Sequence, residues 1–215
     1  MKPIRLIIFD LDGTLVNTLE DLTDSVNFTL GHLGRPRLHL DAVRQYVGDG
    51  MEMLLTRALG GHTDLLDKAK DIFTDHQSRN LVVSSRLYPG VEETLEHFRS
   101  LPLAVVTNKT LEFSEPLLEQ LGIRPYFGMI IGADAGLPLK PAPDAFLSIM
   151  KGLAVPKEST VVVGDGTTDI LAGKAAGITT CAVTYGFRSE DELRKAGPDH
   201  VIHEFSELKQ VFRAE

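Results

Sequence analysis

The chain has 215 residues, of which 43% are hydrophobic, and it carries 22 Lys and Arg against 30 Asp and Glu, for a formal net charge of -8. This composition fits a globular protein made of one large domain or of a core with a smaller partner. The acidic balance argues against nucleic acid or an anionic membrane surface as the main partner. The single cysteine, Cys181, excludes an internal disulfide. The start shows no signal-peptide pattern and no apolar run approaches the ~20 residues of a membrane span, so we expect a cytoplasmic protein without a membrane partner.

The first predicted element is a strand that ends in two aspartates. The run Ile4–Ile8 has the β-branched content and the length of a buried strand, and Asp10 and Asp12 follow it before the turn at Gly13. Residues i and i+2 of an extended chain point to the same side, so the two carboxylates can converge on one point beyond the strand. Such a pair is costly unless a cation or a shared proton offsets the repulsion. Because open α/β sheets bind ligands at this edge, the stretch is a candidate functional site.

The following stretch is predicted to be helical. Apolar residues recur at helical spacing between the cap-like Thr18 and the stop at Gly34. Three further helices are predicted at Leu40–Val47, Met51–Leu59 and Leu65–Leu81. No strand pattern interrupts this block, and the turn Gly48-Asp49-Gly50 separates its second and third helices. We therefore expect residues 17–83 to form an all-helical domain inserted after the first strand.

Strands and helices alternate from residue 84 onward. Strands are predicted at Leu103–Val106, Gly128–Ile131, Thr160–Val163, Thr179–Val183 and His200–Ile202. Helices are predicted at Val91–Arg99, Glu112–Leu121, Pro143–Lys151, Thr168–Ala176 and Glu190–Lys195. This alternation predicts an α/β fold with a parallel sheet and helices on both faces. The first strand must join that sheet, so residues 1–16 and 84–215 are expected to form one discontinuous catalytic core.

Polar groups follow two of the later strands. Thr107 and Asn108 come directly after one strand, and Asp165 comes after another. If these strands run parallel to the first, their carboxyl ends share one edge of the sheet and Asp10, Thr107 and Asp165 can meet there. Lys140 lies in a proline-restricted loop that could aim its ammonium at the same point.

The residues expected at this edge suit phosphoryl transfer. Carboxylates are hard oxygen ligands of the kind that Mg²⁺ prefers. A site that leaves coordination positions of the metal open also suits Mg²⁺, which commonly bridges to a phosphate. A carboxylate can attack phosphorus while the metal and a lysine offset the negative charge, and a second carboxylate can handle the leaving-group proton. The seven histidines are scattered and no cluster has zinc-ligand spacing, which argues against zinc hydrolysis.

The chain resembles the haloacid dehalogenase superfamily, since it contains in the superfamily's order the motifs Asp10-x-Asp12-Gly13-Thr14, Thr107-Asn108, Lys140-Pro141 and Gly164-Asp165-x-x-x-Asp169. The resemblance implies a Rossmann-like, doubly wound, mainly parallel sheet with an inserted helical cap. Within the superfamily the segments Val47–Gly50 and Leu54–Leu59 look most like those of phosphoglycolate phosphatases. It therefore implies a Mg²⁺-dependent phosphomonoester hydrolase that acts on a small phosphorylated metabolite, with phosphoglycolate favoured, as a monomer or homodimer.

The resemblance also implies a role for each motif residue. Asp10 would be the nucleophile that forms an aspartyl-phosphate, and Asp12 would protonate the leaving alkoxide and then deprotonate water. Lys140 would neutralise both the nucleophile and the phosphoryl group. The phosphate oxygens would be held by Thr107, Asn108 and Lys140, and the metal by the Asp10 side chain, the Asp12 carbonyl, Asp165 and Asp169.

Two positions depart from the superfamily pattern, and four residues of the insert are specificity candidates. Asn17 stands where many relatives carry Asp, and Gly166 stands where Ser is frequent. The mechanism needs no charge at either position. We therefore expect these departures to tune the flap and the metal loop rather than to abolish activity. The cap candidates are Gly48, Asp49, Gly50 and Arg57, although most such charges only solvate a helix face.

Three other functions share parts of this pattern. A sugar phosphomutase of the same superfamily shares the whole core, and it would interconvert phosphosugars without net phosphate release. A phospho-accepting signalling domain also uses acidic residues, Mg²⁺, Thr and Lys, but it gives no reason for the helical insert or for Asp12. A halide-releasing dehalogenase needs neither a proton donor at Asp12 nor Mg²⁺. The phosphatase interpretation therefore accounts for more of the residues.

Overall fold

The computed structural model describes residues 1–215, and its core is a six-stranded parallel sheet with the order β6-β5-β2-β7-β8-β9. These strands are β2 (Leu6–Phe9), β5 (Leu103–Val106), β6 (Met129–Ile131), β7 (Thr160–Gly164), β8 (Thr179–Val183) and β9 (His200–Ile202). From β2 the chain first builds the sheet outward through β5 and β6, and it then returns to add β7, β8 and β9 on the other side. The switch point therefore lies at β2 and β7, and the predicted doubly wound sheet is confirmed.

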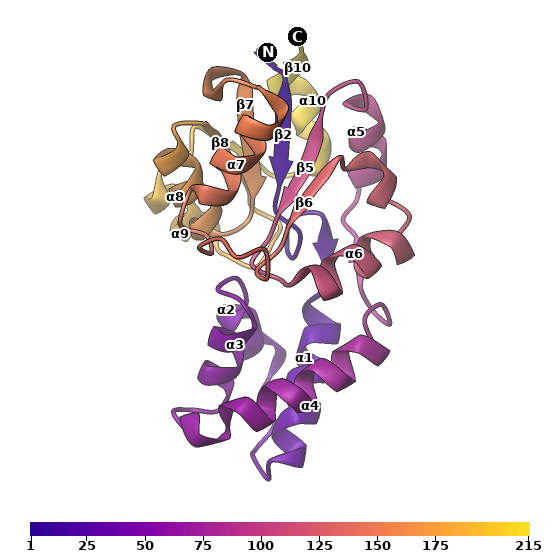
Figure 1. Cartoon of the computed structure of the whole chain (residues 1–215), viewed down its shortest axis with the longest axis vertical. Coiled ribbons are helices and arrows are strands. Elements are labelled where there is room, and N and C mark those ends of the chain that lie inside the picture. The colour runs from indigo at the N-terminus through magenta and orange to yellow at the C-terminus, as the bar shows by residue number, and fades with distance from the viewer.

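Both faces of this sheet are covered by helices, as the period-two alternation of side chains requires (Figure 1). Leu6 and Ile8 face a cluster with α7 (Asp144–Leu153) and α8 (Thr167–Ala176). Ile7 and Phe9 face the larger cluster, which includes α5 (Val91–His97), α6 (Leu111–Gln120) and α10 (Leu208–Val211). The helix α9 (Glu190–Ala196) packs against β8 through Leu193. All four residues of β2 are 0% exposed, and burial of each such side chain stabilises the fold by ~1.5–3 kcal/mol.

A separate group of helices lies beyond the carboxyl ends of the strands (Figure 1). It comprises α1 (Leu19–His32), α2 (Leu40–Tyr46), α3 (Met51–Ala58) and α4 (Leu66–Arg79), which share their own apolar cluster. The prediction of one helix over Leu65–Leu81 is wrong at both ends, because a 3-10 turn at Thr63–Leu65 precedes α4 and the helix stops at Arg79. Leu81 continues the apolar spacing, but its side chain is buried in the large core cluster instead.

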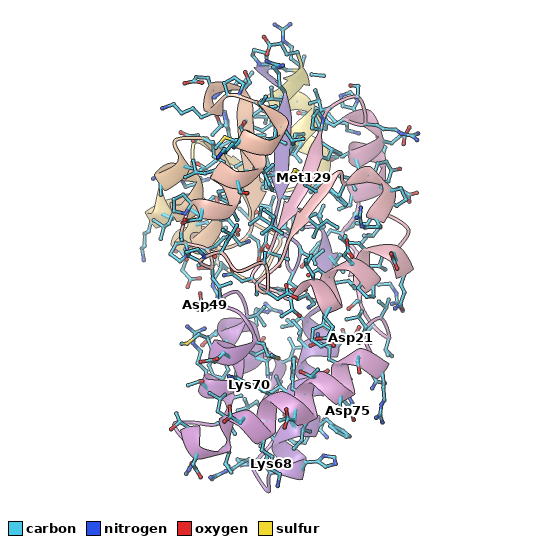
Figure 2. The ribbon with its side chains drawn as sticks, in the orientation of Figure 1. Asp21, Asp49, Lys68, Lys70, Asp75 and Met129 are labelled. Carbon is cyan, nitrogen blue, oxygen red and sulfur yellow. The ribbon has the colours of Figure 1, made fainter.

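Two short linkers join the helical group to the sheet. The strands β3 (Val16–Asn17) and β4 (Arg86–Leu87) pair antiparallel, and the sequence pattern did not predict them. The Asp21 carboxylate, 5% exposed, accepts hydrogen bonds from the backbone N–H groups of Val83, Ser84 and Ser85 at 3.1, 2.8 and 2.8 Å. Asp21 is labelled at this junction in Figure 2. The domain boundaries that we propose at 16–17 and 83–84 fall within these linkers.

The two ends of the chain meet in a second small sheet that sequence reasoning missed. The strand β1 (Lys2–Ile4) pairs in parallel with β10 (Phe212–Ala214), and the termini lie close together in Figure 1. Three-residue strands with exposed charged positions have no clear alternation, so the pattern contains no signal for them. None of the helices is long and apolar enough to cross a membrane.

Candidate active site

Three carboxylates meet at the switch point of the sheet. Asp10 follows β2, Asp165 follows β7, and Asp169 lies in the first turn of α8. One carboxylate oxygen of each lies within 4.8 Å of the others. The Asp169 side chain is 1% exposed and that of Asp10 is 13% exposed. The sequence placed these residues at strand ends, and the parallel sheet brings the strand ends together.

Lys140 is the counter-charge of this cluster. Its Nζ donates to Asp10 Oδ1 at 2.7 Å, to Asp169 Oδ1 at 2.6 Å and to the Val106 carbonyl at 2.9 Å. These three bonds use all the donors of one ammonium group. Burial by itself lowers the pKa of Lys140, but the charges of Asp10 and Asp169 outweigh it and the pKa is raised. The lysine is therefore a fixed positive charge beside Asp10.

The cluster still holds more negative charge than Lys140 can balance. Burial raises the pKa of Asp10, the charge of Asp169 raises it further, and Lys140 only partly lowers it. Burial also raises the pKa of Asp165, against the lowering effect of its hydrogen bond from the Phe187 N–H. Three carboxylates against one ammonium form a set of hard oxygen ligands that a divalent cation would neutralise. The residues present therefore fit a metal ion.

Asp165 is held in place from two sides. Thr14 Oγ1 donates to Asp165 Oδ1 at 3.0 Å and accepts from the Asp165 N–H at 3.0 Å, and the Phe187 N–H donates to Oδ2 at 2.7 Å. A Cβ at Gly13 would lie 2.2 Å from Oδ2, and one at Gly186 would lie 2.3 Å from the Asp165 Cβ. Both glycines are needed because the backbone approaches this carboxylate closely. Phe187 and Gly186 follow β8, and no charge or motif in the sequence marked them.

Asp12 is held apart from the carboxylate cluster. Thr18 Oγ1 donates to Asp12 Oδ1 at 2.6 Å, and Lys109 Nζ donates to both carboxylate oxygens at 3.1 Å. The side chains of Lys109 and Asp12 are 8% and 13% exposed. Thr18 does stand at the N-cap position of the first helix, but its hydroxyl makes no capping hydrogen bond, so the predicted side-chain cap is wrong. Sequence reasoning missed Lys109, although it directly follows the Thr107-Asn108 motif.

The Asn108 amide connects the site to the helical group. Its Nδ2 donates to the Gly48 carbonyl at 2.9 Å and to the Lys140 carbonyl at 3.1 Å, and its Oδ1 accepts from the Lys140 N–H at 3.0 Å. The amide therefore has other partners than the phosphate oxygens expected for it. Thr107 Oγ1 accepts from the Lys109 N–H at 3.2 Å, which leaves its hydroxyl hydrogen free to donate.

Comparison with known proteins identifies the family of the chain. The family model described as haloacid dehalogenase-like hydrolase matches residues 7–183. A phosphoglycolate phosphatase of Vibrio parahaemolyticus is 38% identical over 220 residues, which cover 98% of this chain and 96% of the relative. The chain belongs to the haloacid dehalogenase-like hydrolase family. Within that family it is an enzyme of the phosphoglycolate phosphatase-like type.

Solved structures of the family have the same fold over nearly the whole chain. A predicted phosphoglycolate phosphatase from Haemophilus somnus superposes with a TM-score of 0.93 at 32% identity, covering 98% of this chain and 99% of that one. CbbY from Rhodobacter sphaeroides in complex with phosphate superposes with a TM-score of 0.82 at 25% identity, covering 95% and 96%. The helical group therefore occurs in this family together with the sheet.

The predicted cap residues of this haloacid dehalogenase-like hydrolase lie at the boundary with the core. Gly48 and Gly50 have φ values of +118° and +87°, and a Cβ at Gly50 would lie 3.3 Å from the Asn108 carbonyl oxygen. Asp49, labelled at the core-facing end of the helical group in Figure 2, pairs with Arg57 at 2.5 Å. Each side chain of that pair is about one-third exposed. Arg57 is thus engaged by Asp49 within its own helical group.

A cavity separates the helical group from the core beside Asp10 and Asp12. Its apolar lining comes mostly from the helical group and consists of Leu22, Val47, Met51, Leu54, Phe73 and Phe113. The cavity offers about 60 Å³, which is room for about four to six waters at ~10–15 Å³ each. A second hollow of about 80 Å³ also borders Asp10 and Asp12 and is lined by Asp49 and Asp165.

Proposed function

We propose that this enzyme is a Mg²⁺-dependent phosphomonoester hydrolase that acts on a small phosphorylated metabolite through an aspartyl-phosphate at Asp10. The observation that supports this most is the placement of Asp10, which is bonded to Lys140 at 2.7 Å and lies with Asp165 and Asp169 at the switch point of the sheet. A carboxylate with a fixed cation beside it is suited to attack an anionic phosphate.

In the first half of the proposed reaction, Asp10 attacks phosphorus and the bond to the leaving oxygen breaks. Asp12 gives its proton to the leaving alkoxide, so that no free alkoxide is released. In the second half, Asp12 takes a proton from water, which attacks phosphorus and frees Asp10 and inorganic phosphate. Thr18 and Lys109 hold the Asp12 carboxyl apart from the metal-ligand cluster for this purpose.

The proposed metal site uses the cluster that has excess negative charge. The carboxylates of Asp10, Asp165 and Asp169, with the main-chain carbonyl of Asp12, would hold Mg²⁺. The bound ion would offset the repulsion between the attacking carboxylate and the phosphate. Thr14 and the Phe187 N–H keep Asp165 in place for that role.

The phosphoryl oxygens would be bound from the core side of the cavity. The Thr107 hydroxyl has a free hydrogen to donate, and the Lys140 ammonium lies beside Asp10. Asn108 contributes indirectly, because its amide fixes both the Lys140 loop and the Gly48 carbonyl of the helical group. The helical group covers the site and limits water during the reaction.

Phosphoglycolate is the substrate that we favour. The cavity of about 60 Å³ suits a leaving group of a few heavy atoms. The curated relatives at 36–39% identity carry the name phosphoglycolate phosphatase. A substrate as large as a sugar phosphate would require the helical group to move away from the core.

The test is phosphate release from a panel of small phosphate esters, with and without Mg²⁺. We expect Asp10→Asn to lower kcat by about 10⁴-fold or more, since it removes the nucleophile, and EDTA to abolish release. Asp24→Asn, an exposed carboxylate of α1, is the matched control and should behave as wild type. Retained activity in Asp10→Asn, or in EDTA, would falsify the mechanism.

A further inference from the structure

The segment Tyr185–Arg188, which follows β8, contacts the carboxylate cluster and the helical group at the same time. On the core side, the Tyr185 hydroxyl donates to the Thr14 carbonyl at 2.8 Å. The Phe187 N–H donates to Asp165 Oδ2 at 2.7 Å. Since Thr14 also holds Asp165 through its hydroxyl, this segment fixes that carboxylate both directly and through the turn after β2.

The side chains of the same segment reach the helical group. Phe187 is partly buried against the apolar cluster that the helical group shares. The Arg188 guanidinium donates to the Arg44 carbonyl at 3.1 Å and to the Val47 carbonyl at 2.5 Å. Phe187 therefore packs on the helical group through its ring and holds Asp165 through its backbone, and Arg188 ties the next position of the chain to α2.

The carbonyls that Arg188 binds lie at the end of α2, on the side of the helical group that faces the core (Figure 1). The backbone becomes extended at Val47, so the helix stops there and its last carbonyls receive no N–H from a further turn. A charged donor makes strong hydrogen bonds to such carbonyls. Arg57 binds the neighbouring Tyr46 carbonyl at 3.0 Å, but it does so from within the helical group. The bonds of Arg188 come from the core.

A second contact between the core and this helix end comes from Asn108. Its amide donates to the Gly48 carbonyl at 2.9 Å, and its other hydrogen bonds join it to the backbone of Lys140. None of these bonds leads to Asp165. Asn108 therefore helps to hold the helical group against the core, whereas the contact through Arg188 belongs to the segment that also holds Asp165.

We propose that Arg188 is a positioning residue that couples the closed position of the helical group to the placement of Asp165. This inference rests on the proposed function, in which Asp165 is a ligand of Mg²⁺. When the helical group moves away from the core, the two bonds of Arg188 must break or must pull residues 185–188 with them. Either change loosens the hydrogen bond from Phe187 to Asp165. Metal binding and closure therefore favour each other, because coupling between two sites is reciprocal.

The experiment measures Mg²⁺ binding by calorimetry and amide hydrogen exchange by NMR, with MgCl₂ and without any phosphate ester. In wild type, MgCl₂ should slow exchange at the Phe187 amide and also at residues 44–48 of the helical group, which are not metal ligands. Arg188→Met removes both bonds to α2. Its Kd for Mg²⁺ should rise by at least about fivefold, the lower end of ordinary coupling between two sites. Saturating MgCl₂ should no longer slow exchange at residues 44–48 in this variant.

Two further variants separate coupling from a general loss of structure. Arg213→Met makes the same change at an exposed position of β10 and should respond to MgCl₂ as wild type does. Arg188→Lys keeps a positive charge and donors for a carbonyl, so it should recover part of the Mg²⁺ affinity. Should Arg188→Met fail to fold, Arg188→Lys decides by the same two measurements. Equal Mg²⁺ affinity in wild type and Arg188→Met overturns the inference, and so does a response at residues 44–48 that survives in Arg188→Met.

Failure of the proposed function gives a different result from failure of this inference. Neither measurement needs turnover, so a response to MgCl₂ at residues 44–48 that Arg188→Met removes supports the inference even when no phosphate ester is hydrolysed. Phosphate release that depends on Asp10 and Mg²⁺, together with equal Mg²⁺ affinity in wild type and Arg188→Met, supports the function and contradicts the inference.

Discussion

The two ends of the cavity are built in opposite ways. At the end near Asp10 the charged side chains already hold one another, since Lys140 bonds to Asp10 and Asp169, and Asp165 is fixed by Thr14. At the other end the lining is largely apolar and comes mostly from the helical group. The end near Asp10, the reacting end, is therefore held together by charges and hydrogen bonds, whereas the far end is formed by apolar packing within the helical group.

The two ends also differ in which elements support them. The reacting end is built from consecutive carboxyl ends of β2, β5 and β7, which are locked in one sheet. The far end needs α4 and α6, and these are joined through the linkers that Asp21 organises. Under the proposed function, chemistry would depend on the rigid sheet, and selectivity would depend on how the helical group meets the core.

The largest expected effect comes from removing the charge at the reacting end. Lys140→Met should lower kcat by about 10³-fold, because a preorganised cation beside the developing charge is lost. Steady-state kinetics with a small phosphate ester measures this, and Lys151→Met, an exposed lysine of α7, is the control. A kcat within tenfold of wild type would show that this end is not organised around Lys140.

A smaller effect is expected at Lys109, which lies between the two ends. Lys109→Met frees the Asp12 carboxyl from its bond to the ammonium, and kcat should fall by about tenfold to a hundredfold, the scale of impaired acid–base catalysis. Lys109→Arg should recover part of the loss because it can still bond to both carboxylate oxygens. A rise in KM with kcat unchanged would instead assign Lys109 to substrate binding at the far end.

The smallest expected effect is a pH-dependent stabilisation by the metal. Burial and neighbouring negative charge raise the pKa of Asp10 to about 8, and burial raises that of Asp165 to about 7, from an ordinary value of 3.8. Between the ordinary and the raised pKa values the folded protein holds protons that the unfolded chain has released, so the metal-free protein should lose stability as the pH rises across this range. Mg²⁺ should then restore more stability at higher pH, where it displaces no protons.

Thermal melting at about pH 6 and about pH 8.5, with and without Mg²⁺, measures this effect, and the shift in Tm should be several degrees larger at the higher pH. Asp165→Asn removes a carboxylate from the cluster and should abolish most of the difference. Gln77→Leu lies outside the cluster and should keep it. Equal shifts at both pH values would mean that the metal does not bind to these carboxyls.

The order of most elements and the meeting of the carboxylates near Asp10 could be predicted from the sequence. The apolar runs of β5, β7 and β8 identify buried strands, and motif residues stand directly after β5 and at the end of β7. Side chains alternate along a strand and parallel strands share one edge, so these local patterns are enough to bring Asp10, Lys140 and Asp165 to one place. The ends of α4 and the short strands β1 and β3 could not be predicted from such patterns. Their bounds depend on which apolar cluster of the folded protein buries a given side chain.

By itself the sequence therefore predicted the parallel sheet with helices on both faces, the helical insertion and the place of Asp10 and Asp165 at strand ends, all of which follow from short-range spacing. Only the tertiary structure decided that Lys109 holds Asp12, that Asn108 reaches Gly48, and that Asp21 joins the helical group to the backbone of residues 83–85. These contacts join residues that are remote in the chain, such as Asn108 and Gly48 at a separation of 60 positions. Spacing has no information on them, because they depend on how remote segments of the chain pack together.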